Sequence, residues 1–164
     1  IKKVCFSWGI DNPEVVAISL LCEAMANYYY AKFQDVIEPC NEALAILKNS
    51  IFEDLIGVGH FILGAANRSI GEVDTAVKHL IKGAESISLA GELGIYLCYC
   101  LYQLAEINVQ IKDFSTAKRH YKKVIGIAKE LGNSFVLFRA YNGRANCICQ
   151  LRNSINVKSF LICR

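Results

Sequence analysis

Proline is scarce in this chain, with two residues among 164, and charged residues make up only 20% of the sequence. Because prolines and turn residues accumulate in β-sandwiches, their scarcity favours helices. No apolar run reaches the roughly 18 residues that a membrane span requires. The longest, from Val15 to Ala26, is interrupted by Ser19 and Glu23. The sequence therefore predicts a helical protein that does not contact a membrane.

An excess of charge is also lacking, since the formal net charge is +3. That value is too small to indicate binding to nucleic acid or to an anionic membrane. A signal peptide and an initiating methionine are absent as well. We therefore expect Ile1 to be an internal position of a longer protein whose other domains flank this segment.

Cysteine, in contrast, is abundant, with eight residues that lie within apolar helical stretches. This placement indicates reduced, buried thiols and hence an intracellular, cytoplasmic protein. Two Cys-x-Cys pairs, Cys98 with Cys100 and Cys147 with Cys149, raise the alternative of metal ligation. Residues i and i+2 of a helix point roughly 200° apart, so one ion cannot be held by both. We expect no metal and no cofactor.

An internal repeat with a period of about 40 residues organises the chain. The segment that begins at His60 aligns with the segment that begins at Leu101, with apolar, small and bulky positions in the same order. The matched pairs, all separated by the same interval, are Gly64 with Ala105, Ala76 with Ala117 and Leu80 with Tyr121. A shift by one further repeat extends the frame to Ala24 upstream and to Ala145 downstream. Such self-similarity is typical of stacked helical hairpins, which bury their apolar faces against neighbouring hairpins.

The predicted helices follow from this frame and from local signals. Asn12 caps the first helix and Pro13 lies in its first turn. Pro39 cannot donate to the carbonyl of Asp35, so we expect a kink or a late start in the second helix. Gly132 ends the sixth. The expected helices cover about 12–31, 33–48, 51–70, 72–89, 92–111, 113–131, 133–151 and 154–164, and their short connections predict antiparallel neighbours.

The small residues have a mechanical purpose in this scheme. Helix axes approach to roughly 8 Å only where the crossing lacks bulk. We expect Gly64, Ala76 and Ala117 at such crossings, with Leu80 and Tyr121 between neighbouring pairs. The chain is predicted to be one array over residues 1–164, with repeats at 13–49, 51–90 and 92–132. A truncated repeat at 133–164 follows, and residues 1–11 form the tail of an upstream repeat.

This small-to-large pattern resembles the tetratricopeptide repeat, a helical hairpin of about 34 residues. It is most similar to the long-period forms, of about 40 residues, in bacterial signalling proteins. The sequence departs from the family at Asn27, Asn67 and Asn108, where a tyrosine is expected, and at Arg144, where a leucine is expected. The resemblance implies an all-α fold, an α-α superhelix of antiparallel hairpins. The alternative is an ordinary α-bundle or another α-solenoid.

The resemblance also implies that the first helix of each repeat lines a concave groove that binds a partner's peptide or helix. Aromatic rings interleaved with a few charges suit such a groove. The alternative is that Tyr28, Tyr29 and Tyr99 pack against a neighbouring helix. The expected groove residues are Met25, Tyr28, Tyr29, Phe61, Arg68, Tyr99, Tyr102, Glu106, Arg139, Asn142 and Asn146.

The ligand of this groove is expected to be a protein segment of mixed character. The family's best-known groove grips an acidic carboxyl terminus with cationic side chains. Leu21, Met25 and Tyr99 occupy matching positions here and cannot neutralise a carboxylate. The chain is thus predicted to be an interaction scaffold within a larger signalling or regulatory protein. The alternative is a sensor array coupled to a catalytic or DNA-binding domain outside this segment.

Two further classes of function receive less support. For an enzyme, His60, His79 and His120 have no sequence neighbour that would activate them, so no catalytic residue is predicted. For a nucleic-acid-binding repeat, the basic residues gather on one second helix, which the resemblance places on the solvated convex side. These basic residues are Lys112, Lys118, Arg119, Lys122, Lys123 and Lys129. We expect a protein partner and no nucleic acid.

The two ends of the segment carry apolar residues that would face further repeats. Near the carboxyl end they are Val157, Phe160, Leu161 and Ile162, and near the amino end Val4, Phe6 and Trp8. Uncovered apolar patches commonly mark contact surfaces. We therefore expect self-association of this segment through its ends.

Overall fold

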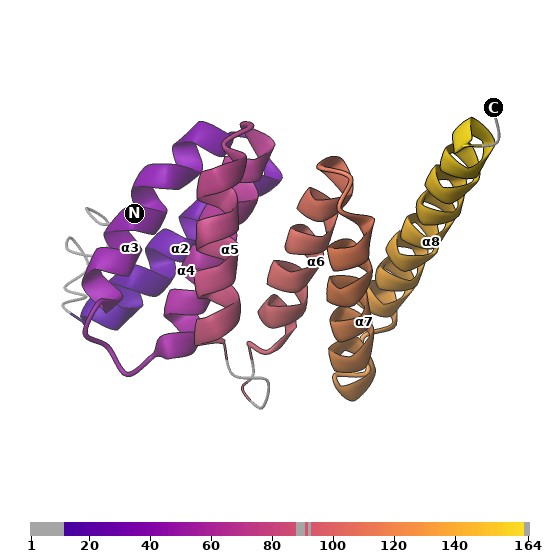
Figure 1. The fold of residues 1–164 in the computed structure, drawn as a ribbon. Helices are drawn as coiled ribbons and strands as arrows, with labels where there is room; N and C mark the ends of the chain where they lie inside the picture. The colour runs from indigo at the N-terminus through magenta and orange to yellow at the C-terminus, as the bar shows by residue number, and fades with distance from the viewer. Residues whose placement is uncertain (1–11, 88–90, 92, 163–164) are drawn as a thin grey trace. The chain divides into compact units, whose positions relative to one another are not determined.

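The computed structural model describes residues 12–87, 91 and 93–162, apart from the side chains of 153–162. Throughout these residues the chain forms helices and no strand, which confirms the all-α prediction. The helices, drawn in Figure 1, are α2 (Pro13–Tyr29), α3 (Ile37–Leu47), α4 (Glu53–Ser69), α5 (Val73–Ser86), α6 (Ile95–Gln110), α7 (Phe114–Glu130) and α8 (Ser134–Ile162). The chain divides into two compact units, Ile1–Cys100 and Leu101–Arg164, called here the N-terminal and C-terminal units.

The first two helices begin as the sequence predicts. The Oδ1 atom of Asn12 accepts a hydrogen bond from the amide of Val15 at 3.1 Å. A short 3-10 helix, Phe33–Val36, precedes α3, and Pro39 lies in the first turn of α3, where its missing amide does little harm. The carbonyl of Asp35, which a residue other than proline would bond, accepts from Nδ2 of Asn27 at 3.1 Å. The predicted late helix start is confirmed.

The bends between paired helices repeat along the chain. Ala31, Gly71 and Lys112 all have left-handed backbone angles, and each occupies the same place in its repeat. In each bend the next amide donates to the carbonyl of an asparagine five residues earlier: Lys32 to Asn27, Glu72 to Asn67 and Asp113 to Asn108, at 2.8–2.9 Å. This is the Schellman motif, which closes a helix and reverses the chain within a few residues. The period seen in the sequence is therefore also a period of backbone conformation.

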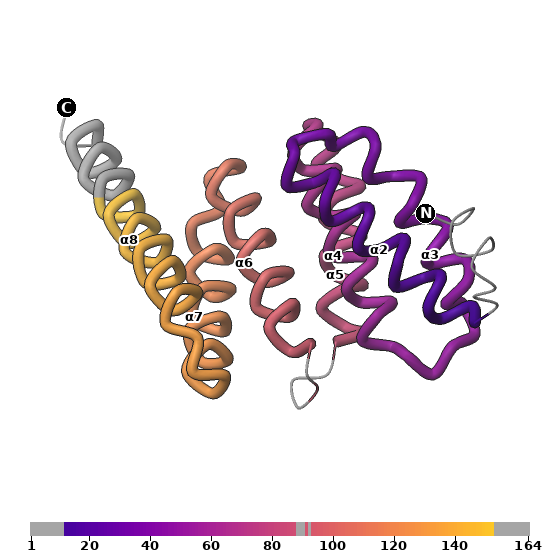
Figure 2. The backbone as a smooth tube through the Cα atoms, turned by 180° about the vertical axis from the view of Figure 1, so that it is seen from behind, coloured from indigo at the N-terminus to yellow at the C-terminus, as the bar shows by residue number. Residues whose placement is uncertain are grey.

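Small residues bring α4 and α5 together in the N-terminal unit. A Cβ atom on Gly64 would lie 2.6 Å from Cγ of Leu80, so only glycine permits this approach. Ala76 is fully buried, as the sequence predicts. Helix α4 also packs against α2 and α3, and Figures 1 and 2 show these four helices as one layered group. The core of this unit therefore forms around α4.

The C-terminal unit uses the same device. Ala117 and Tyr121 of α7 are fully buried, and a Cβ atom on Gly143 of α8 would overlap the Tyr121 ring. The buried ring therefore requires glycine at position 143. Burial of Ala76 and Ala117 confirms two of the small positions that the repeat frame identifies.

One predicted helix boundary is wrong. Residues 133–151 and 154–164 were expected to form separate helices, but α8 continues from Ser134 to Ile162. Its start is capped by Asn133, whose Oδ1 accepts from the amide of Val136 at 2.9 Å. No glycine or proline lies between Leu151 and Ser154, so nothing in the local sequence stops the helix. The fourth repeat therefore has no bend at the expected place.

The predicted burial of the cysteines is only partly confirmed. Cys40, Cys98, Cys100 and Cys147 are buried free thiols, but Cys22 and Cys149 are exposed. Burial raises the pKa of Cys40 to about 12, so this side chain remains a neutral thiol at physiological pH. Cys5 and Cys163 lie outside the described residues.

The apolar residues at both ends lie outside the part of the chain that the structure describes. They are Val4, Phe6 and Trp8 near the amino end and the side chains of Val157, Phe160, Leu161 and Ile162 near the carboxyl end. Self-association therefore stays a prediction.

Among the described helices, none combines the length and the apolar character that crossing a bilayer requires.

The bends predict opposite effects of two substitutions. Gly71→Ala should lower the free energy of unfolding by about 1 kcal/mol, because the left-handed region disfavours a Cβ atom. Ala31→Gly relieves the same penalty and should raise stability by a similar amount. The loss of stability in Gly71→Ala does not come from a steric clash, because no atom lies within 4 Å of a Cβ atom placed on Gly71. Urea denaturation measures both, and equal effects of one sign would contradict the assignment.

The close approach of α7 and α8 predicts a second contrast. Gly143→Ala should destabilise the chain by about 1–3 kcal/mol, since the added methyl group meets the buried Tyr121 ring. Gly126→Ala in α7 is the matched control, because a Cβ there meets nothing within 4 Å. The control should raise stability by about 0.5–1 kcal/mol through helix propensity. Calorimetry showing that Gly143→Ala is harmless would refute the packing.

Candidate functional site

An apolar groove in the N-terminal unit is the first candidate site. It has a volume of about 180 Å³ and lies between α2, α4 and the start of α6. Its lining residues, which define the apolar groove, are Ile18, Leu21, Cys22, Met25, Leu55, Val58, Ile62, Leu93 and Tyr96. On both α2 and α4 these residues recur every three or four positions, so each helix contributes one stripe.

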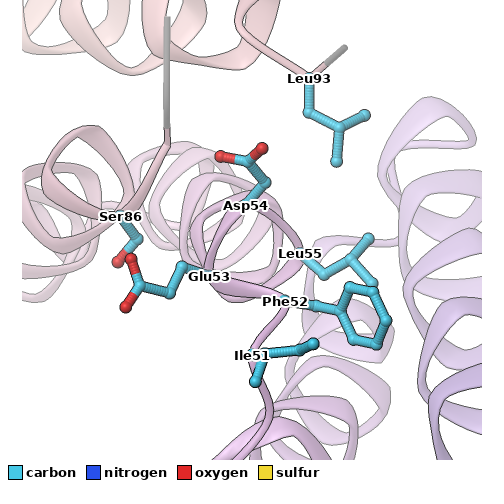
Figure 3. A pocket seen from close by; sticks show the side chains of 7 residues that line it. All are labelled: Ile51, Phe52, Glu53, Asp54, Leu55, Ser86 and Leu93. Atoms are coloured by element: carbon cyan, nitrogen blue, oxygen red, sulfur yellow. The ribbon is translucent and has the colours of Figure 1, made fainter. Parts of the chain in front are cut away.

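A second pocket of about 400 Å³ adjoins this groove and shares Leu55 and Leu93 with it. The lining residues, which define the acidic pocket, are Ile51, Phe52, Glu53, Asp54, Leu55, Ser86 and Leu93. Figure 3 shows the Glu53 carboxylate beside Ser86, with the Phe52 and Leu55 side chains close together. Both acidic residues lie in the first turn of α4, where the helix dipole stabilises negative charge. The apolar groove therefore ends beside carboxylates.

Three aromatic rings cluster beside the groove. The ring centroids of Phe61, Tyr96 and Tyr99 are 5.5–5.7 Å apart. Phe61 is buried, and its ring packs against the rings of both tyrosines. Burial raises the pKa of Tyr96, with smaller contributions from nearby Tyr29, Tyr99 and Cys22. Tyr96 thus lines the groove and also contacts Phe61 and Tyr99, two of the predicted residues.

The other predicted residues of this unit fall in different surroundings. Met25 lines the groove directly. Tyr28 packs against Phe33 at 5.6 Å, which is the packing alternative considered for it. The side chain of Tyr29 is 78% exposed, whereas Arg68 is half-buried in the last turn of α4. Of the predicted residues in this unit, Met25 lines the groove, and Phe61 and Tyr99 contact the groove residue Tyr96.

In the C-terminal unit the predicted residues contact one another. The Arg139 guanidinium lies 4.5 Å from the centre of the Tyr102 ring. The Tyr121 hydroxyl donates to the Glu106 carboxylate, and the Tyr102 and Tyr121 rings meet edge to face at 5.7 Å. Burial and this hydrogen bond raise the pKa of Tyr121. The polar groups of Arg139, Tyr121 and Glu106 therefore all have partners within this unit. Asn142 and Asn146, which were also predicted, are exposed on α8.

Sequence reasoning missed a histidine pair. His60 of α4 and His79 of α5 approach to 2.9 Å between their Nδ1 atoms. One nitrogen must donate and the other accept, so the contact requires at least one neutral ring. Burial, His79 and Lys82 lower the pKa of His60 to about 4, and burial and Lys82 lower that of His79. Only the hairpin brings these residues together, because they are 19 positions apart.

Other groove residues were also missed. Ile18 and Cys22 continue the stripe of the predicted Met25 with a helical periodicity, so sequence reasoning could have found them. Leu93 and Tyr96 follow the connection after α5, and their positions depend on how that connection runs. Among the residues that the structure describes, no three His, Cys, Asp or Glu side chains gather into a possible metal site.

The histidine pair predicts a dependence of stability on pH. The pKa of both rings lies below the unfolded value of 6.5, so the folded state binds fewer protons. The contribution of the pair to stability should be constant above about pH 6.5 and fall as the pH drops toward the folded pKa of His60, about 4. Both rings are only half-buried, so solvent screening keeps the loss below about 1.4 kcal/mol per pH unit for each ring. The double variant His60→Gln, His79→Gln should flatten this fall in melting temperature. An unchanged slope would show that the pair is not the cause.

Comparison with family models and with curated proteins does not identify a relative. No family model matches this sequence, and no curated protein matches it. The resemblance to tetratricopeptide repeats therefore stays a prediction from the sequence.

Proposed function

We propose that this chain is a protein-interaction module, a tetratricopeptide-like array of hairpins that binds a partner's segment in the apolar groove. The observation that carries the proposal is an apolar groove that opens to solvent. Ile18, on its edge, is 42% exposed although it is β-branched and apolar. Exposed apolar surface beside a concave pocket is a common feature of binding sites.

The recurring bends support the repeat-array part of this proposal. A left-handed residue follows the first helix of each of the first three repeats, with the same hydrogen bonds. In addition, α2 packs against α4, and these are the first helices of successive repeats. Stacking of equivalent helices is what a solenoid requires, because each hairpin leaves an apolar face for the next.

The chemistry of the two adjoining pockets favours a ligand of mixed character. Apolar side chains of the ligand would fill the groove beside Met25 and Tyr96 and gain from leaving water. The carboxylates of Glu53 and Asp54 would attract a lysine or arginine at one end of the ligand. They would also repel an acidic tail. The proposed ligand is therefore an apolar segment that carries a cationic residue.

A sensor array that controls another domain of a longer protein is the second candidate, and it would use the same groove. Binding in the groove bridges α2, α4 and α6, so a ligand would stabilise their arrangement. The two candidates differ in what the binding event regulates, and they share the binding step.

Peptide selection tests that shared step. A phage library of random dodecamer peptides, selected on the immobilised chain, should enrich peptides with several apolar residues and one lysine or arginine. Ile18→Asp should weaken the binding of these peptides by at least tenfold, because it places a charge in the groove.

Val15→Asp is the matched control. Val15 also lies on α2, is 41% exposed and is β-branched, but it does not line the groove. Affinity should be unchanged in this variant. Selection that enriches no peptide, or peptides that bind Ile18→Asp as tightly as the unaltered chain, would refute the proposed function.

A further inference from the structure

A basic pocket lies in the C-terminal unit, which does not contain the groove. It has a volume of about 360 Å³ and lies between α7 and α8. Its lining residues, which define the basic pocket, are Ser115, Lys118, Arg119, Lys122, Arg144 and Leu151. Four of these six side chains are cations, and none is a carboxylate. The α7 members recur at intervals of three, one and three residues, so they form one stripe that faces α8.

Arg144 is the unusual member of this pocket. The repeat frame aligns it with Leu104 and Leu63, both of which are buried. Arg144 is itself half-buried, and its Nε atom is buried and makes no hydrogen bond with the described residues. A buried guanidinium donor without an acceptor costs free energy. The position where the repeat needs a leucine therefore holds a donor that lacks an acceptor.

The nearby acid does not balance the pocket's charge. Asp113 caps α7, and its carboxylate accepts from the Thr116 amide at 3.1 Å and from the Ser115 hydroxyl at 2.8 Å. These hydrogen bonds lower the pKa of Asp113 to about 2, so it is an anion. Arg119 donates to Thr116 Oγ1 at 3.0 Å. Asp113 interacts with Arg119, whereas the pocket lining itself holds four cations and no carboxylate, so an added anion would relieve the repulsion among them.

We propose that the basic pocket binds a phosphate group, with Arg144 as its inner ligand. A phosphate dianion offers several acceptor oxygens to guanidinium and ammonium donors, and guanidinium groups bind such oxygens in pairs. Arg144 supplies its guanidinium from α8, while Lys118, Arg119 and Lys122 supply further positive charge from α7. The phosphate is either free or carried by a phosphorylated side chain, since both present the same oxygens.

Thermal unfolding of the whole chain tests this proposal with sodium phosphate as the probe and sodium chloride at equal ionic strength as the reference. Phosphate should raise the melting temperature in a saturable manner. Arg144→Leu restores the repeat's apolar residue, so it should raise the melting temperature without phosphate. The same variant should weaken phosphate binding by at least tenfold. A purely structural arginine would show neither change.

Two neighbouring lysines provide the matched comparison, and they keep the test decisive if Arg144→Leu folds poorly. Lys122 lines the pocket, whereas Lys123 is exposed on the same helix and does not. Lys122→Gln should weaken phosphate binding severalfold, and Lys123→Gln should leave it unchanged. Equal effects of the two, or a rise no greater than that with chloride, would overturn the proposal.

The source of the phosphate follows from a second titration. A phosphoserine peptide that binds more than tenfold tighter than inorganic phosphate and its unphosphorylated form supports a phosphorylated partner. Equal affinities support a free phosphate. A single-stranded oligoribonucleotide that binds tightly irrespective of Arg144→Leu would identify the surface as a nucleic-acid site instead and would overturn the proposal.

Discussion

The left-handed residue that ends each first helix is the constraint on which the hairpins depend. At Ala31, Gly71 and Lys112 the chain reverses within a few residues, and the reversal is held by the same backbone hydrogen bonds. A helix that ends this way must pack against its successor. The approach is then close enough that Gly64 has no room for a Cβ atom beside Leu80. The left-handed bend and the small residue at the helix crossing thus together fix how paired helices pack. The positions of the groove residues on those helices follow from this packing.

The sequence was sufficient to predict features that depend on local signals or on the repeat frame. Asn12 caps α2, Pro39 delays α3, and Ala76 and Ala117 are buried, all as expected. These signals act over a few residues or recur along the chain, so a single sequence reveals them.

Features that depend on packing between elements could not be predicted in the same way. His60 and His79 meet only because α4 and α5 form a hairpin in one rotational setting. Phe61 is buried and its ring packs against the rings of Tyr96 and Tyr99, which periodicity on α4 alone does not show. The boundary expected near Leu151 was carried over from the repeat frame. There the frame conflicted with a local sequence that continues the helix, and the local sequence prevailed.

Departures from the repeat pattern are where the distinctive chemistry lies. Asn67 and Asn108, at equivalent positions of the repeat frame, donate to the carbonyls of Leu63 and Leu104 at 2.8 and 2.7 Å. Asn27, at the equivalent position, instead bonds the carbonyl that Pro39 leaves open. Arg144 replaces a buried leucine and lines a basic pocket. The N-terminal unit thus presents an apolar groove that ends in carboxylates, and the C-terminal unit a cationic pocket.

Hydrogen exchange at the three bends tests most directly whether the period of the sequence is also a period of structure. The amides of Lys32, Glu72 and Asp113 each bond an asparagine carbonyl five residues earlier. Measured residue by residue by nuclear magnetic resonance, all three should exchange orders of magnitude more slowly than amides of an unfolded chain, because exchange requires opening of the helix end. Exchange at unfolded-chain rates at any one of the three positions would contradict the repeated bend on which the account depends.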